Sequence, residues 1–437
     1  MDSLPWLHAF DVLQNEEILK ERAKQTVPSL GGLAALPLEQ ACMQLDKALR
    51  TVFYPTAQCL SILKRLIGVA HAHCMSVYPD SKAFLAGVYS LKPPLPEFAL
   101  PICLTGLAGV GKTELLRAFR RVLDTDSKLM LDGQHPFPIC RTWQVTVLAR
   151  STPKDVLRTL CQSEGSPSAL VEKCRKLAYR DSVSLLMADE FQFATGSESA
   201  NARVSQMLLS LCYIGVPFVF AANYSLIRRL QRRPGEEQQR LLSTPIILCP
   251  DSPNSADWQN TLKTQRDILP DYFIFDPVQD AVTLHAYTAG RKRAMAHLLL
   301  LAFRSEYPKG GKVDCQALRR AYHSTEHGGY REETERLVAQ AIQKRPDPGR
   351  KDLWCPFPLE ADASVEFLNA SIAARDARVA EAEITAALTQ AERRATLELK
   401  QESLKHANSG HVVPLHKKAK VTADELKRNA NMFRDQI

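Results

Sequence analysis

The chain has 437 residues, of which 45% are hydrophobic and 24% are charged. This composition is typical of a globular protein and excludes an intrinsically disordered one, and the length predicts two or three structural units rather than a single core. The net charge of +8 is compatible with a phosphate-backbone partner and equally with ordinary solubility, so charge alone identifies no nucleic-acid-binding protein.

The eleven cysteines include no Cys-x-x-Cys pair and show no metal-ligand spacing with histidine, which indicates reduced thiols in a cytosolic protein. The first residues lack the basic start and apolar run of a signal peptide. The longest apolar stretches, such as Cys212–Ala222, are shorter than the ~20 residues that span a bilayer. We therefore expect a cytoplasmic protein with no membrane partner.

Residues 1–95 are expected to form a helical N-terminal region. Apolar residues recur there at helical spacing, and Pro55 stands where a first helical turn tolerates proline. The Pro-rich segment 92–96 breaks any helix, so we place a domain boundary near residue 95.

Residues 96–276 are expected to form an α/β domain, because β and α signals alternate along them. Thr152-Pro153 is typical of a helix start, with Thr152 as N-cap. Continuous rather than alternating apolarity marks strands that are covered on both faces, which predicts a parallel sheet sandwiched by helices. The five predicted strands are Phe98–Thr105, Trp143–Ala149, Ser182–Ala188, Val216–Ala222 and Thr244–Cys249.

Helical patterns replace the strands after residue 276. A helical segment over 277–345 is indicated by the periodicity around Ala294–Phe303 and Ala317–Ala321. Residues 346–437 are expected to be a C-terminal helical extension with a basic tail, since the stretch from Ala361 to about His406 contains neither glycine nor proline.

A glycine-rich phosphate loop follows the first strand and precedes an amphipathic helix, which is the context that this motif requires. In it, glycines let backbone N–H groups face phosphates, the lysine places a charge on the β- and γ-phosphates, and the threonine hydroxyl is suited to a magnesium ligand. The predicted nucleotide-binding residues are Gly106, Leu107, Ala108, Gly109, Val110, Gly111, Lys112, Thr113 and the adjacent Glu114.

Polar residues at the ends of later strands would complete a catalytic set. Asp189 would hold magnesium, together with Thr113, and Glu190 would orient and deprotonate the attacking water. Asn223 follows the fourth strand and is a candidate to hydrogen-bond the γ-phosphate or the lytic water. An arginine near the start of the fifth strand could reach a neighbouring subunit's nucleotide; the candidates, between which the sequence does not choose, are Arg232, Arg233 and Arg240.

These motifs resemble those of the AAA+ ATPases, with the phosphate loop as Walker A, Asp189-Glu190 as Walker B, Asn223 as sensor one and a lid motif at Gly290–Arg293. The resemblance implies a sheet of order 5-1-4-3-2, binding of ATP and Mg²⁺, ATP hydrolysis, and a sensor-two role for Arg293.

Three further segments resemble the TnsC/TniB regulators of Tn-seven-like transposition. They are Phe53-Tyr54-Pro55-Thr56, Met187–Gln192 and Tyr213–Phe220, and the similarity covers roughly residues 50–320. It implies a protein that oligomerises as a ring or filament on duplex DNA with ATP, links a target-selection protein to transposase subunits, and disassembles on hydrolysis.

Regulators of this kind contact DNA mainly through phosphates, so the basic residues after the second strand, Arg150 and Lys154, are candidate contacts. A solvated helix N-terminus explains both equally well. The C-terminal helix and tail are candidate docking segments for transposase subunits, and a solvated helix with a disordered end is the alternative.

Three other functions remain open. A replication initiator or helicase loader would share every nucleotide-site residue but should add a helix-turn-helix after the lid, and residues 330–437 show no recognisable one. A metabolic P-loop enzyme would need neither the arginine cluster nor the lid motif. A signalling scaffold that uses nucleotide only to gate assembly would hydrolyse ATP weakly.

Overall fold

The computed structural model describes residues 4–86, 92–124, 128–130, 136–147, 151–189, 198–358, 386–389 and 392. The chain divides into two compact units, Met1–Ala374 and Arg375–Ile437. The helix predicted from Ala361 to about His406 and the basic tail after it lie almost wholly outside the described residues. Among the helices that the structure does describe, none is both long and apolar enough to cross a membrane.

A five-stranded parallel sheet forms the centre of the first unit. Its strand order is β4-β5-β6-β1-β7, and Leu104 of β1 lies between Ala221 of β6 and Ile246 of β7. Numbered along the chain and read from β7, this order is 5-1-4-3-2, so the predicted α/β fold and sheet order are confirmed. The strands are β1 (Pro101–Gly106), β4 (Thr142–Thr146), β5 (Leu185–Asp189), β6 (Phe218–Ala222) and β7 (Thr244–Leu248).

Strands β1, β5 and β6 begin two or three residues later than the apolar runs predict, whereas β7 begins at Thr244 as predicted and β4 begins one residue early. Ser182 has a left-handed φ of 58°, and the N–H of Val183 donates to the carbonyl oxygen of Ala178 at 2.9 Å. These two buried residues therefore close the end of α8 (Pro167–Arg180) instead of entering β5. Apolarity overestimates strand length here because the residues that turn the chain into the sheet are buried as well.

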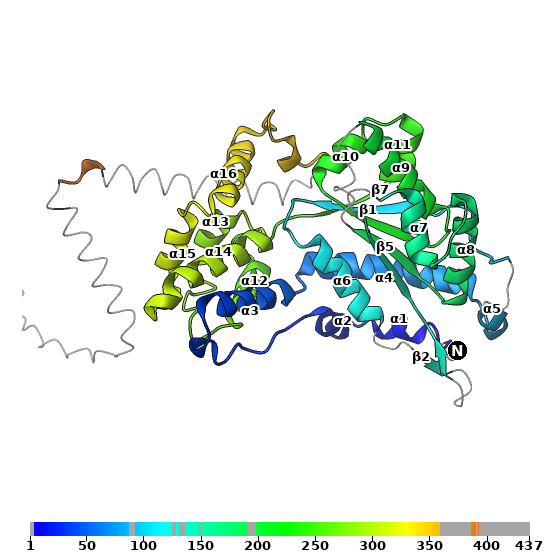
Figure 1. Cartoon of the computed structure of the whole chain (residues 1–437), viewed down its shortest axis with the longest axis horizontal. Helices are drawn as coiled ribbons and strands as arrows, with labels where there is room; N and C mark the ends of the chain where they lie inside the picture. Colours follow the sequence, from blue (N-terminus) through cyan, green and yellow to red (C-terminus); the bar gives the residue numbers. More distant parts are fainter. Residues whose placement is uncertain are drawn as a thin grey trace, which may run out of the picture. The chain divides into compact units, whose positions relative to one another are not determined.

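Helices cover both faces of the sheet (Figure 1). One layer contains α1 (His8–Val12), α2 (Glu16–Ala23), α4 (Ala57–Val77) and α6 (Lys112–Leu123). The other contains α7 (Pro153–Cys161), α8, α9 (Glu198–Cys212), α10 (Tyr224–Leu230) and α11 (Gly235–Leu242).

Capping residues fix where two of these helices begin. Thr152 caps α7 in a capping box with Asp155, and Pro153 is the first helical residue, as predicted. Thr56 caps α4, so Pro55 precedes the helix. The sequence had instead suggested that Pro55 stands in the first turn. The hydroxyl of Thr56 accepts from the N–H of Cys59, a bond that proline at position 55 leaves undisturbed.

A second hydrophobic core lies beside the sheet domain (Figure 1) and is centred on the buried rings of Trp258, Phe273 and Phe303. It is formed by α3 (Leu38–Thr51), α12 (Ala256–Arg266), α13 (Ala281–Thr288), α14 (Lys292–Glu306) and α15 (Cys315–Tyr322). The N-terminal region is thus shared, because α3 packs on α14 whereas α1, α2 and α4 pack with the sheet. Residues 52–56 cross between the two cores. The predicted domain boundaries stay predictions.

The second core, together with α16 (Gly328–Gln343), is called the lid. After α16 the chain returns to the sheet domain. Arg228 of α10 donates from Nε to the carbonyl oxygen of Lys351 and from Nη2 to that of Trp354, each at 2.9 Å. The remaining short elements are η1 (Leu33–Ala35), α5 (Ser81–Ala86), β2 (Lys128–Met130), β3 (Pro136–Pro138), η3 (Tyr307–Lys309) and η4 (Lys351–Leu353). The antiparallel pair β2–β3 was not predicted, because three residues are too few to show a strand pattern.

Candidate functional site

The phosphate loop joins the end of β1 to the start of α6. Gly109 and Gly111 have positive φ values of 82° and 118°, which other residues adopt only with strain. Gly106 ends β1 so close to β7 that a Cβ there would overlap the carbonyl oxygen of Leu248. Leu107 and Val110 are buried. Glycine is therefore required at these three positions by the backbone itself.

Lys112 is the first residue of α6 and is only 8% exposed. Its Nζ donates to the carbonyl oxygens of Gly106 and Leu107, at 2.9 Å each. The ammonium group therefore lies inside the curve of the loop, next to the first turn of α6, whose free N–H groups favour an anion.

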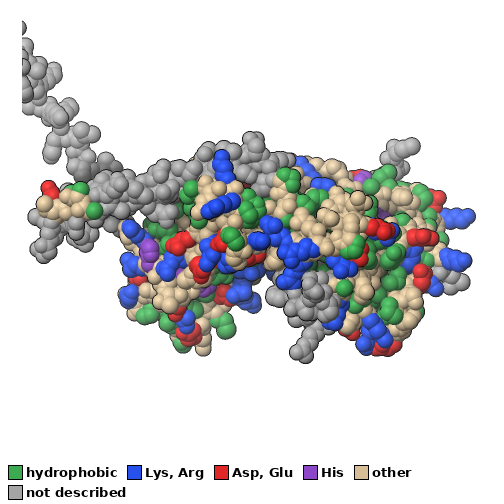
Figure 2. Space-filling view, turned by 90° about the horizontal axis from the view of Figure 1, so that it is seen from above, with side chains coloured by type: hydrophobic (Ala, Val, Ile, Leu, Met, Phe, Trp, Pro, Cys, Tyr) green, Lys and Arg blue, Asp and Glu red, His purple; other side chains and the backbone are tan. Residues whose placement is uncertain are grey.

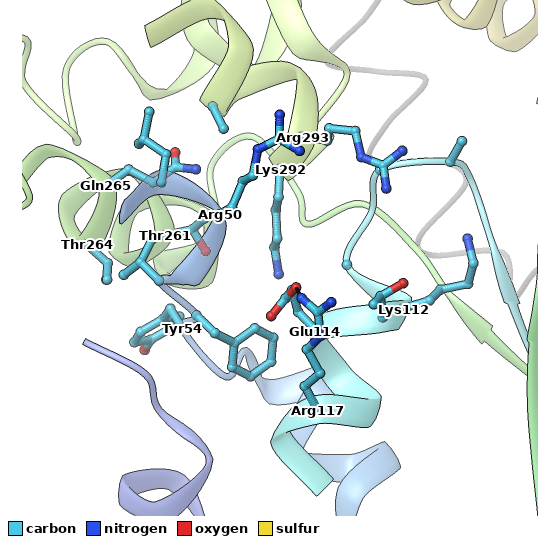
Figure 3. A pocket seen from close by; sticks show the side chains of 18 of the residues that line it. Arg50, Tyr54, Lys112, Glu114, Arg117, Thr261, Thr264, Gln265, Lys292 and Arg293 are labelled. Atoms are coloured by element: carbon cyan, nitrogen blue, oxygen red, sulfur yellow. Dashed lines mark hydrogen bonds and ion pairs between the residues drawn. The ribbon is translucent and has the colours of Figure 1, made fainter. Parts of the chain in front are cut away.

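A cavity of about 480 Å³ opens in front of the loop (Figure 3). Nine of the predicted nucleotide-binding and catalytic residues line the wall of this cavity. They are Ala108, Gly109, Gly111, Lys112, Thr113, Glu114, Asp189, Asn223 and Arg293. Gly106, Leu107 and Val110 shape the loop from behind without lining the cavity. Glu190 lies outside the described residues.

Asp189 and Asn223 end neighbouring strands. Asp189 is the last residue of β5 and is 5% exposed, and Asn223 follows β6 as the N-cap residue of α10. The side chain of Asn223 makes no capping hydrogen bond, although asparagine commonly does at this position. Because the carboxyl ends of parallel strands meet at one edge, both side chains lie beside the phosphate loop, where ligands bind in such sheets.

The lid contributes Lys292 and Arg293, the first two residues of α14. The N–H of Arg293 donates to the carbonyl oxygen of Gly109 at 3.1 Å, and a Cβ on Gly109 would lie 2.9 Å from the Cβ of Arg293. Arg291 of the same motif points away from the cavity and binds Glu333, with 2.5 Å between Nη1 and Oε2. The lid therefore contacts the phosphate loop directly, through one backbone bond and one close approach.

Sequence reasoning missed Lys292 as a site residue. Its Nζ lies 3.5 Å from Oδ2 of Asp251, which follows β7. Burial alone would lower the pKa of Lys292, but the Asp251 carboxylate, together with Cys59 and Asp257, opposes burial, and the net effect is a raised pKa. Lys292 is thus held charged between lid and loop. Its partner lies 41 positions away in the sequence, so no local pattern could indicate the pair.

The end of the cavity opposite Lys112 is formed by residues that no local motif identified as a binding wall (Figure 3). Phe53 and Tyr54 come from the connection between α3 and α4, and Thr261, Thr264 and Gln265 come from α12. Both threonine hydroxyls donate within their own helix, to the carbonyl oxygens of Asp257 and Asn260. Gln265 is 4% exposed, and its Oε1 is buried without a hydrogen-bond partner among the described residues.

Glu114 stands between the two ends of the cavity. Burial raises the pKa of its carboxyl group, and the guanidinium of Arg117, with Nη1 at 2.5 Å from Oε1, opposes that rise. The middle of the cavity therefore carries charges of both signs, with Arg117 and Lys292 as its cations.

The candidate intersubunit arginines lie away from this cavity. Arg233 forms an ion pair with Glu237 at 2.9 Å, and Arg240 forms one with Glu236 at 2.9 Å and lies over the ring of Phe98. Arg232 is exposed. The face that carries α10 and α11 shows Lys and Arg side chains with Asp and Glu among them (Figure 2). Of the two candidate DNA contacts, Lys154 is exposed near the start of α7, and Arg150 lies outside the described residues.

Comparison with known protein families matches part of the chain. Residues 99–230 match the family model described as an AAA domain. No protein with a curated description matches the chain.

Solved structures with a similar arrangement include three archaeal proteins. The ORC2 protein of Aeropyrum pernix, solved as ADPNP and ADP complexes, is 13% identical with a TM-score of 0.42, and the match covers 72% of this chain and 94% of that one. The ORC1 protein of the same organism, in complex with DNA, is 17% identical with a TM-score of 0.38, over 71% and 76% of the two chains. Cdc6p of Pyrobaculum aerophilum is 11% identical with a TM-score of 0.38, over 66% and 78%.

The family match begins just before β1 and ends with α10, so it spans the phosphate loop, Asp189 and Asn223. Residues 99–230 therefore carry an AAA domain, and the chain has the AAA+ P-loop fold.

Proposed function

We propose that this protein is an ATP-dependent regulator of DNA transposition, which oligomerises on duplex DNA with ATP and disassembles when ATP is hydrolysed. The observation that supports a nucleotide switch most strongly is the single cavity that joins the phosphate loop, Asp189 and Asn223 to Lys292 and Arg293 of the lid. A ligand that spans these elements would bind the sheet domain and the lid at once, so its γ-phosphate could bias the lid between two positions.

Each residue near the loop has a proposed role. The loop N–H groups and Lys112 bind the phosphates, Thr113 and Asp189 hold Mg²⁺, Glu190 orients and deprotonates the attacking water, and Asn223 and Arg293 contact the γ-phosphate. Bound Mg²⁺ would neutralise charge on the phosphates. The fit is supported by the left-handed glycines, by the buried Lys112, and by the carboxylate of Asp189 at the same edge of the sheet.

Gln265 supports ATP as the nucleotide. Its buried Oε1, at the end of the cavity away from Lys112, is an acceptor that lacks a donor among the described residues. A buried acceptor without a donor costs free energy, which a ligand that supplies an N–H group recovers. The exocyclic amino group of adenine is such a donor, whereas guanine carries a carbonyl oxygen at that position. Tyr54 and Phe53 offer aromatic surface beside it for the base.

Assembly would bring an arginine of one subunit to the nucleotide of the next, and Arg232, Arg233 and Arg240 remain the candidates. Arg233 and Arg240 have carboxylate partners four residues away within α11 or at its start. Exposed pairs of this kind are weak, so either guanidinium can change partners on assembly. The proposed partners are duplex DNA, further copies of this chain, a target-selection protein and transposase subunits.

The transposition role rests on the resemblance of residues 53–56, 187–192 and 213–220 to the TnsC/TniB regulators. Residues 53–54 line the cavity, and Tyr213 is half-exposed at the end of α9. The lining of the cavity by residues 53–54 supports a response of the first segment to nucleotide.

The test is ordered assembly on random-sequence duplex DNA, imaged and followed by light scattering, with ATP and with a slowly hydrolysed analogue. We expect assemblies that require nucleotide, are lost for Lys112→Ala and persist for Glu190→Gln, while the surface control Lys173→Ala behaves as the wild type. A protein that stays monomeric on DNA with every nucleotide would overturn the proposal. Binding confined to one particular duplex sequence would favour a replication initiator instead.

A further inference from the structure

A second hollow, of about 780 Å³, lies outside the nucleotide cavity, where the end of α2, the outer side of α6 and strand β4 meet. Its lining is dominated by five basic side chains: Arg22, Lys24, Arg117, Arg120 and Arg121. One carboxylate, Asp124, and two amides, Gln25 and Gln144, complete it. Five cations against one anion give the hollow a strong positive charge.

The positive charge of the hollow is only partly neutralised. Arg120 pairs with Asp124 at 3.1 Å, and Arg117 pairs with Glu114, which lines the nucleotide cavity instead. The side chains of Arg22 and Lys24 form no ion pair or hydrogen bond with any residue that the structure describes. On and just before α11, by contrast, Arg240 and Arg233 each have a carboxylate within 3 Å. The hollow therefore contains two cations, Arg22 and Lys24, whose charge no carboxylate among the described residues neutralises.

We propose that this hollow binds the phosphate backbone of duplex DNA, an inference that rests on the proposed DNA-linked function and names the surface that carries it. The lining contains only charged and amide side chains. Protein–protein interfaces need an apolar or aromatic centre, whereas backbone contacts to DNA are made by Arg, Lys and Gln without one. Guanidinium groups match phosphate oxygens in a bidentate way, and the two amides can donate to further oxygens. Such contacts read no bases, so binding here is independent of sequence.

The hollow and the nucleotide cavity lie along the same helix, α6, and have one lining residue in common. Helix α6 begins at Lys112 in the phosphate loop and carries Arg117, Arg120 and Arg121 on its next turns. Arg117 lines both the hollow and the cavity. The guanidinium of Arg121 lies 5.7 Å from the ring centre of Phe53, another cavity residue, and its Nη2 donates to the carbonyl oxygen of Ala23 at 2.6 Å.

DNA and nucleotide would therefore contact the same helix, α6, and Arg121 would link the hollow to Phe53 of the nucleotide cavity. A coupling between two sites is reciprocal by thermodynamic necessity. If ATP tightens DNA binding at the hollow, DNA tightens ATP binding by the same factor. The ATP-bound form of the protein would then accumulate on DNA.

The test uses the full chain with a slowly hydrolysed ATP analogue and a fluorescent random-sequence duplex, titrated at a series of salt concentrations. The double variant Arg22→Gln/Lys24→Gln removes the two cations of the hollow that have no acidic partner among the described residues. Each phosphate contact that is lost reduces the slope of log K against log salt by roughly 0.9, so the slope should become shallower by about 2 and affinity at low salt should fall at least tenfold. The control Lys173→Gln/Lys176→Gln, with the same change of charge on α8, should leave slope and affinity unchanged.

Nucleotide affinity and the melting temperature of each variant, measured without DNA, show whether the fold is intact. A wild-type slope in the Arg22→Gln/Lys24→Gln variant would overturn the inference alone, while the proposed function would stand. Loss of DNA-free self-association with an unchanged slope would also overturn it, and would assign the hollow to an acidic surface of a second copy. Wild-type protein that binds no duplex in any nucleotide state would overturn both proposals. Binding that needs the hollow but not nucleotide would support the hollow and overturn the switch.

Discussion

The two ends of the nucleotide cavity are built in opposite ways. The phosphate end consists of eight consecutive residues, Gly106–Thr113, together with two strand ends, and its shape is set by positive φ angles and by hydrogen bonds within the loop. The far end is assembled from residues 53–54 and α12, which meet only because α3 and α4 belong to different cores.

This difference indicates that the two ends of the cavity have different roles in nucleotide binding. A rigid loop whose shape is set mainly by its own backbone can bind phosphates in any conformation of the lid. A wall made of two separate segments, one of them in the lid, changes when the lid moves. We therefore expect substitutions at the phosphate end to alter affinity for every nucleotide, and substitutions at the far end to alter selectivity and lid stability.

The largest effect is expected for Lys112→Ala. The substitution removes the charge at the phosphates and two hydrogen bonds that hold the carbonyl oxygens of the loop. Loss of a buried, charge-assisted interaction costs about 3 kcal/mol, which is roughly a hundredfold in affinity. Titration with fluorescent ATP and GTP analogues should show equal losses for both. A loss confined to ATP would mean that the two ends are not separable as described.

Acid should destabilise the lid core through His285, which is 4% exposed, lies edge-on to Trp258 and has Nε2 3.0 Å from the carbonyl oxygen of Asp251. Burial lowers the pKa of His285 from 6.5 to about 4. A lowered pKa means that the unfolded chain binds the proton more readily, so stability is complete above pH 6.5 and falls between pH 6.5 and 4, by about 2–3 kcal/mol.

His285→Gln should flatten this part of the stability profile, measured as melting temperature from pH 7.5 to 4.5. The exposed His8→Gln is the matched control and should keep the wild-type slope. His73 and His327 also have pKa values lowered to about 4 by burial, so some slope should remain in the variant. An unchanged slope in His285→Gln would assign the acid sensitivity to those two residues.

Gln265→Leu should separate selectivity from affinity at the far end. Removal of the acceptor loses one hydrogen bond to adenine, about 1.4 kcal/mol or tenfold in ATP affinity, and leaves GTP affinity unchanged. Thr264→Val, in the same wall, is the control, because that hydroxyl already donates to the carbonyl oxygen of Asn260. Without nucleotide, Gln265→Leu should melt no lower than the wild type, since it removes a buried acceptor that has no donor among the described residues. A clear loss of stability would show that Oε1 has a partner in the free protein.

The contrast between the two ends also explains what the sequence could predict. Residues 106–114, Asp189 and Asn223 were identified because backbone geometry and strand ends leave a local pattern of residue types. The sheet order followed from the AAA+ resemblance, and the parallel character of the sheet from buried apolar runs. Gln265, Lys292 and Arg117 carry no such pattern, because their role depends on which helices pack together. In the sequence Asp251 is likewise an ordinary loop residue, and only the packing of α14 beside the end of β7 makes it the partner of Lys292.

The smallest effect is expected for Arg293→Ala, where the two ends touch. The backbone N–H of residue 293 still donates to the carbonyl oxygen of Gly109 after the substitution, so the lid keeps its contact with the loop. Only the guanidinium is lost, and an interaction of an exposed arginine contributes about 0.5–1 kcal/mol, roughly a twofold to fivefold change. Because this group would contact only the γ-phosphate, ATP affinity should fall by that factor while ADP affinity stays constant, as competitive titration would measure. If ADP affinity falls as well, the side chain acts on the loop and not on the γ-phosphate, and the lid would then sense occupancy of the site but not hydrolysis.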